Sequence, residues 1–114
     1  MIIDSHCHLD YEPMFSNLEK VIKRAKESNV KFMLTISVTD NKYDVILNII
    51  KKFNNVYGTY GIHPHEAKNH LSLKSDEIVK KAKLNKKIIG IGESGLDFYY
   101  NHSEKNDQIK CFEE

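Results

Sequence analysis

The chain begins MIIDSHCHLD (residues 1–10), and this stretch holds the first of four predicted strands, each followed by a helical pattern. Residues 1–3 are apolar and predict a buried strand, after which Asp4, His6 and His8 occupy alternate positions. Because successive side chains of a strand point to opposite faces, these three share one face and Cys7 lies on the other. Two imidazoles side by side at a strand end can bind one metal ion. The alternative is a strand end with two hydrogen-bonded polar residues.

Three further apolar runs begin near residues 30, 56 and 87, and a helical pattern follows each of the four runs. The first helix is expected to begin at a capping box, Ser16-Asn17-Leu18-Glu19, and to end at Asn29. Other helices are expected over 41–53 and 76–82, with a last one beginning near residue 104. Strands that alternate with helices predict an α/β fold with a parallel sheet and right-handed crossovers.

Four such units fit two architectures, a small doubly wound sheet or half of a (β/α)₈ barrel, in one domain over residues 1–114. In both, ligands bind where the strands end. The residues at or just past the predicted strand ends are His6, His8, His63, His65 and Glu93. Imidazoles with a carboxylate suit zinc, manganese or iron better than calcium, and the two oxygens of Glu93 could bridge two ions.

Composition excludes several classes of protein. The 17 basic and 16 acidic residues nearly cancel, so no net field directs the chain to nucleic acid or membrane. No apolar run approaches the length of a membrane span, and no basic segment precedes an apolar one at the start. The two cysteines, Cys7 and Cys111, lack the spacing of a metal site or a disulfide framework. These features predict a soluble cytoplasmic protein.

Three segments resemble one known family, in the order in which that family carries them. DSHCHLD (4–10), GIHPHEA (61–67) and GESGLDFYY (92–100) are similar to motifs of the TatD family of metal-dependent deoxyribonucleases. That family belongs to the amidohydrolase-like TIM-barrel hydrolases, and GESGLD is its most specific segment here. Gln108 and Phe112, at Q-x-x-x-F spacing, also fit. The resemblance covers the whole chain and implies four parallel (β/α) units, the N-terminal half of a TIM (β/α)₈ barrel.

The resemblance also implies an activity, the hydrolysis of DNA phosphodiester bonds by a water molecule that two divalent metal ions activate. His6 and His8 match the pair that binds one ion. Glu93 matches the carboxylate that links both ions and serves in catalysis. Zinc, manganese and magnesium all remain candidates. DNA is the implied substrate, and no membrane partner is expected.

Four more residues match positions around that site. His63 is implied to contact the substrate phosphate, and His65 is either a second substrate contact or a structural cap for the next helix. Asp4 is expected to lie outside the set of metal ligands and to fix the tautomer of a ligand imidazole. Asp97 is expected either to do the same or to cap the loop after residue 95.

Length is where the chain departs from the family. A full barrel takes about 250 residues, and this chain has 114. Two histidines and an aspartate that the family supplies from later strands have no counterpart, so we expect weak metal binding and little activity from the chain alone. Four strands cannot close a barrel, and their uncovered surface favours self-association. Two alternatives stay open: another D-x-H-x-H hydrolase acting on cyclic amides or phosphate monoesters, and a non-catalytic vestigial half-barrel.

Overall fold

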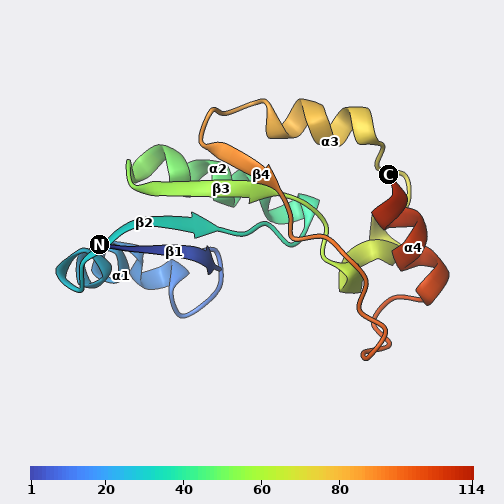
Figure 1. Cartoon of the computed structure of the whole chain (residues 1–114), viewed down its shortest axis with the longest axis horizontal. Helices are drawn as coiled ribbons and strands as arrows, with labels where there is room; N and C mark the ends of the chain where they lie inside the picture. Colours follow the sequence, from blue (N-terminus) through green and yellow to red (C-terminus); the bar gives the residue numbers. More distant parts are fainter.

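The computed structural model describes residues 1–114 and contains one parallel sheet with the strand order β1-β2-β3-β4. All four arrows in Figure 1 point the same way, so their carboxyl ends lie at one end of the sheet. This order confirms consecutive parallel βα units and excludes a doubly wound sheet, whose strand order would reverse. The elements are β1 (Ile2–Cys7), η1 (Phe15–Asn17), α1 (Leu18–Glu27), β2 (Val30–Thr35), η2 (Asp40–Lys42), α2 (Tyr43–Lys52), β3 (Val56–Tyr60), η3 (Pro64–Asn69), α3 (Ser75–Ala82), β4 (Ile88–Ile91) and α4 (Lys105–Glu113).

The core lies between the sheet and the helices that cover one of its faces. Ile46 and Ile50 of α2 are fully buried against Val56 and the rest of β3, and apolar side chains of α1 and α3 extend the same cluster. Gly58 makes this close packing possible, because a Cβ there would lie 2.8 Å from Cγ2 of Ile46. None of the helices combines the length and the apolar composition that crossing a membrane requires.

The last helix does not join that layer. Helix α4 contacts η3, beyond the carboxyl ends of the strands (Figure 1). Its buried Gln108 donates from Nε2 to the carbonyl oxygens of Asp97 (2.8 Å) and Ser103 (2.9 Å). The helix is therefore attached to the loop that follows β4. The expectation that the helices of all four βα units lie on one face of the sheet is therefore wrong for α4.

The ends of α1 show one wrong prediction and one correct one. Ser16 does not cap the helix, because its hydroxyl donates to Glu12 (2.6 Å) and a 3₁₀ turn precedes α1. The capping-box prediction is therefore wrong. Asn29 lies just past the helix with φ of 64°, a left-handed conformation that asparagine tolerates. The predicted end of the helix is therefore confirmed.

The face of the sheet opposite the helices carries uncovered apolar side chains. Ile3, Phe32 and Ile89 are 58%, 40% and 60% exposed. Together with Tyr57 they line a shallow groove of about 370 Å³. Uncovered apolar surface of this kind favours association.

We therefore expect the 114-residue chain to self-associate at micromolar concentration, and Ile89→Lys to shift it toward the monomer. The reason is that a charge in the groove opposes burial of its apolar lining. Sedimentation velocity measures the change. Leu84→Lys is the matched control, because Leu84 is similarly exposed (64%) but lies outside the groove. A wild-type chain that sediments as a monomer throughout this range would show the expectation to be wrong.

Candidate metal centre

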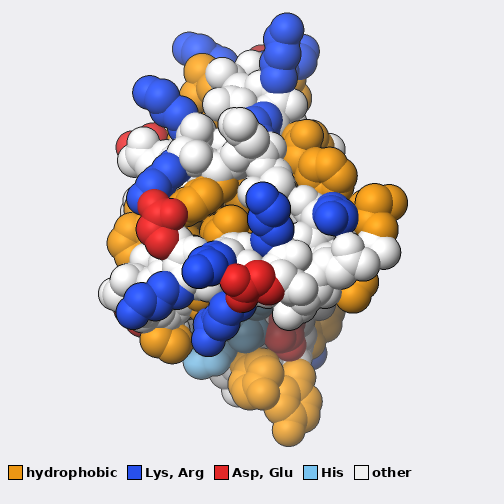
Figure 2. Space-filling view, turned by 90° about the vertical axis from the view of Figure 1, so that its left-hand side faces the viewer, with side chains coloured by type: hydrophobic (Ala, Val, Ile, Leu, Met, Phe, Trp, Pro, Cys, Tyr) orange, Lys and Arg blue, Asp and Glu red, His pale blue; other side chains and the backbone are white.

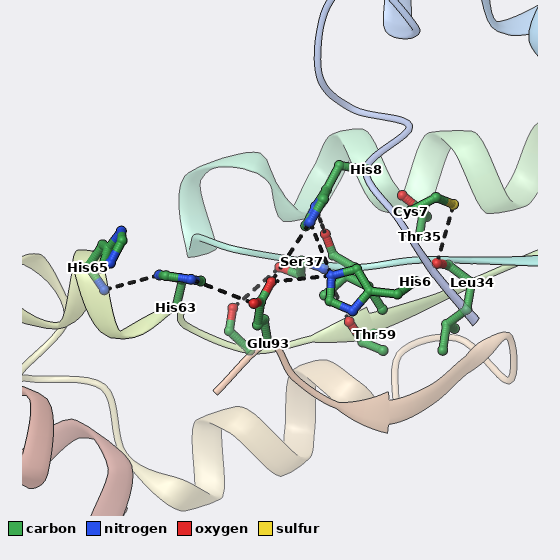
Figure 3. A network of polar contacts seen from close by, with 12 residues as sticks. His6, Cys7, His8, Leu34, Thr35, Ser37, Thr59, His63, His65 and Glu93 are labelled. Carbon is green, nitrogen blue, oxygen red and sulfur yellow. Dashed lines mark hydrogen bonds and ion pairs between the residues drawn. The ribbon is translucent and has the colours of Figure 1, made fainter. Parts of the chain in front are cut away.

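Two histidines at the end of the first strand and a glutamate that follows the fourth meet at the carboxyl end of the sheet. Nε2 of His6 lies 3.3 Å from Nε2 of His8. Oε2 of Glu93 lies 3.6 Å from the first of these nitrogens and 3.8 Å from the second. Figure 3 shows both imidazoles pointing toward this carboxylate. Among residues 1–114, these three form the one group of at least three His, Cys, Asp or Glu side chains gathered closely enough to hold an ion.

The spacing of these three atoms suits a metal ion. A triangle with sides of 3.3, 3.6 and 3.8 Å has a point about 2.1 Å from every corner, the usual length of Zn–N and Zn–O bonds. His6 is exposed, while His8 and Glu93 are half-buried, so the group is open to solvent on one side. Three protein ligands with an open side are typical of catalytic sites, whereas structural zinc sites are closed by four.

The tautomer of His8 also suits ligation. Its Nδ1 lies 3.2 Å from the carbonyl oxygen of Ile36, and a carbonyl can only accept. The proton of the neutral ring is therefore on Nδ1, and Nε2 keeps its lone pair, which points toward His6 and Glu93. A hydrogen bond of this kind to the second ring nitrogen is usual for metal-binding histidines.

The position of Glu93 depends on a close approach between two backbone segments. Glu93 N–H donates to the carbonyl of Ser37 (2.8 Å), and Gly92 N–H donates to that of Tyr60 (2.9 Å). This path crosses the end of β3 at Gly61, where a Cβ would lie 2.5 Å from the carbonyl carbon of Gly92. Gly92 itself has φ of +155°, which favours glycine. Glycine at both positions therefore lets the carboxylate reach the histidines of β1.

Buried hydroxyl groups join the strand ends where the sheet hydrogen bonds stop. Oγ1 of Thr35 accepts from Leu9 N–H (3.1 Å), and Oγ1 of Thr59 accepts from Ser37 N–H (3.1 Å). Thr35, Ser37 and Thr59 are all almost completely buried. Figure 3 shows them near His6, His8 and Glu93. They hold the backbone beside His8 and Glu93 in place. Sequence reasoning missed them, although hydroxyl residues at positions 35 and 37 of an otherwise apolar strand were the available signal.

His63 faces the other oxygen of the same carboxylate, with Nε2 at 3.6 Å from Oε1 of Glu93. Its Nδ1 accepts a hydrogen bond from the N–H of His65 (3.1 Å). Burial lowers the pKa of His63 below its usual value, although Glu93 opposes this shift. The ring is therefore neutral at pH 7 and carries its proton on Nε2. It presents a hydrogen-bond donor to the site and no lone pair for a metal.

The two aspartates of the predicted site have different partners. Oδ2 of Asp97 lies 2.8 Å from Nε2 of His65, and this hydrogen bond lowers the pKa of the carboxyl group. Asp97 also accepts from Tyr99 N–H (3.0 Å), which holds the loop. Asp4 accepts from the backbone N–H of His6 (3.1 Å). It therefore contacts the backbone of a predicted ligand, whereas the sequence had suggested contact with an imidazole ring.

Cys7 lies on the other face of β1 from the two histidines. Its thiol donates to the carbonyl of Leu34 (3.4 Å), and burial raises its pKa to about 12. A thiol that stays protonated at neutral pH is a poor metal ligand.

An open cleft of about 530 Å³ lies over these residues. Its lining includes three imidazoles, two carboxylates and one phenol, from His8, Tyr11, Val38, His63, His65, Glu66 and Glu93. Two of the three proposed ligands, His8 and Glu93, therefore line a space large enough for a small polar substrate.

Comparison with known proteins identifies the family. The sequence profile described as "TatD related DNase" matches residues 3–114. The chain belongs to the TatD-related DNase family. The fold agrees, because the crystal structure of YjjV, a TatD homologue from Escherichia coli, superposes with a TM-score of 0.80 at 22% identity. That superposition covers 98% of this chain and 44% of YjjV.

Curated relatives match along the whole chain. An uncharacterized metal-dependent hydrolase of Buchnera aphidicola subsp. Acyrthosiphon pisum is 38% identical, over 99% of this chain and 46% of the relative. YcfH of Escherichia coli, also named as a metal-dependent hydrolase, is 29% identical, over 97% of this chain and 42% of YcfH. The chain thus spans about half the length of the curated relatives that it matches.

The close approach at Gly61 gives a test of how the site is built. We expect Gly61→Ala to lower the free energy of unfolding by about 1–3 kcal/mol, because the added methyl group overlaps the Gly92 backbone. Gly90→Ala is the matched control, since its Cβ would lie an ordinary 3.7 Å from Cγ2 of Thr59. Urea unfolding of both variants measures the difference. Equal stability of the two would show that the backbone crossing is looser than described.

Proposed function

We propose that the chain carries part of the active site of a metal-dependent hydrolase that cleaves DNA phosphodiester bonds. The observation that carries this proposal is the meeting of His6, His8 and Glu93 at atom separations that suit a divalent ion. Membership of the TatD-related DNase family and the names of the curated relatives support it.

The imidazoles and the carboxylate would have separate tasks. His6 and His8 would hold the ion through Nε2, and the carbonyl of Ile36 would keep the ring of His8 in the ligating tautomer. Glu93 would contribute Oε2 to the same ion and keep Oε1 on the side of His63. A bound divalent ion supplies Lewis acidity that polarises a phosphoryl oxygen. Because a carboxylate has two oxygens, Glu93 could also serve a second ion.

His63 would act on the substrate. Its neutral ring presents Nε2–H to the cleft, and a phosphate oxygen placed there would accept that hydrogen. A donor held in this orientation before the substrate arrives stabilises the negative charge that develops on phosphorus-bound oxygens during displacement. His65 would line the same cleft, with its ring held by Asp97.

A metal titration tests the proposed centre. We expect the 114-residue chain to bind about one equivalent of Zn²⁺, because its residues supply one three-ligand group. Glu93→Gln should weaken binding by about 100-fold or more, since loss of groups that merely support a ligand already costs about 10- to 100-fold. Glu27→Gln is the control, because Glu27 is an exposed carboxylate paired only with Lys23 on α1. Isothermal titration calorimetry gives the stoichiometry and the affinities.

A nuclease assay with Mn²⁺ then tests the reaction. We expect slow cleavage of single-stranded DNA by the chain alone, and His63→Ala, which removes the ring donor, should slow it by a further factor of about 10² while metal affinity is kept. A chain that binds no metal, or whose affinity is unchanged by Glu93→Gln, would contradict the proposal. That outcome would favour a non-catalytic role for this part of the family fold. Faster cleavage of cyclic amides than of DNA would instead favour another D-x-H-x-H hydrolase.

A further inference from the structure

The loop that follows β4 presents a group of aromatic rings beside the cleft. Tyr99 is 85% exposed and Tyr100 is 52% exposed. Their rings meet edge to face with centroids 4.8 Å apart, and the ring of His102 stacks on Tyr100 at 5.7 Å. In Figure 1 this loop projects below the rest of the molecule, and at the lower end of Figure 2 exposed hydrophobic side chains lie next to histidines. Single exposed aromatic side chains are common on protein surfaces, whereas contiguous exposed apolar groups mark interaction sites.

These rings continue without a gap into the candidate metal centre. The ring of His63, which faces Glu93, lies 4.3 Å from that of His65. The ring of His65 lies 5.5 Å from that of Tyr100, which in turn contacts Tyr99. A line of flat side chains therefore runs from the carboxylate to the tip of the loop. We call these rings, His65, Tyr99, Tyr100 and His102, the ring track.

The loop under the ring track is held firmly. Gln108, which is almost fully buried, accepts from Asp97 N–H (2.8 Å) and donates to Ser103 (2.9 Å), so one side chain fixes both ends of the segment. The hydroxyl of Ser103 donates to the carbonyl of His65 (2.7 Å) and accepts from Lys68 N–H (3.3 Å). The tyrosines are thus uncovered although hydrogen bonds hold the segment that carries them at both ends. A loop that used its tyrosines for packing would cover them.

We propose that the ring track binds the bases of single-stranded DNA by stacking, next to the phosphate that enters the cleft. This inference rests on the proposed function, because it assigns the bases of that same substrate to a surface. Every base has a flat π face, so the exposed rings of Tyr99, Tyr100 and His102 can accept any of them, and only where the bases are unpaired. A cation also lies beside the loop, since Nζ of Lys105 is 5.3 Å from the ring of Phe98.

The experiment compares two fluorescent strands in the presence of EDTA, so that no metal contributes to binding. One strand is a short oligothymidylate, and the other is an abasic strand of the same length and charge. We expect the 114-residue chain to bind the oligothymidylate about fivefold or more tightly, because stacking on an aromatic side chain is worth at least this factor. Fluorescence anisotropy gives both dissociation constants. Equal affinity for the two strands, or no binding of either, would overturn the inference.

Matched variants separate stacking from general apolar contact. Tyr99→Leu with Tyr100→Leu should reduce the preference for bases, because only the histidine rings of the track remain, whereas Tyr99→Phe with Tyr100→Phe should keep it, since phenylalanine retains the ring face. Phe15→Leu is the control, because Phe15 is exposed (42%) on η1 and outside the track. Circular dichroism checks that each variant is folded. A preference that is undiminished in the leucine variant would also overturn the inference.

The base preference measured in EDTA does not depend on the metal centre, because no metal is bound under these conditions. Base preference in EDTA without zinc binding would support the ring track and overturn the proposed hydrolytic site. Zinc binding with no preference for bases would overturn the ring track alone.

Discussion

Gly61 has no Cβ, and the backbone of Gly92 and Glu93 crosses the end of β3 through the space that a Cβ would fill. The position of Glu93 beside His6 and His8 depends on this crossing. It brings a carboxylate from the fourth strand within 4 Å of imidazoles from the first, although β2 and β3 lie between them. A larger residue at position 61 would push the segment away from the sheet and take the carboxylate with it. The close packing of two glycine-containing segments is therefore the physical condition for a shared site.

The polar groups around this crossing have divided roles. Buried hydroxyl groups such as that of Thr59 accept hydrogen bonds from backbone N–H groups just past the strand ends. These N–H groups are therefore paired although the hydrogen bonds between the strands end before them. This matters because an unpaired buried polar group would cost stability. The rings at the surface of the site are set by single hydrogen bonds. The carbonyl of Ile36 leaves His8 a lone pair, while the N–H of His65 leaves His63 a proton. Two chemically identical side chains therefore offer opposite functions to the same cleft.

Much of this arrangement could be predicted from the sequence, because it follows from strand periodicity. Alternation placed His6 and His8 on one face of a strand, and the alternation of strands with helices placed Glu93 at the same end of the sheet. What could not be predicted depends on contacts between distant segments. Asp4 accepts a hydrogen bond from the backbone N–H of His6, two residues further along the strand. Helix α4 left the sheet because Gln108 bonds to the loop after β4, a contact that periodicity does not encode.

His6 and His8 offer Nε2 lone pairs to a metal ion, while His63 keeps a proton on Nε2. Two-dimensional ¹H–¹⁵N NMR of the imidazole rings distinguishes these states directly, because protonated and unprotonated ring nitrogens differ widely in ¹⁵N shift. Before metal is added, His8 should be protonated on Nδ1 and His63 on Nε2. On addition of Zn²⁺, the Nε2 signals of His6 and His8 should move to positions typical of ligated nitrogen, and His63 should keep its Nε2 proton. Ligation through His63, or unchanged signals of His6 and His8, would contradict the account.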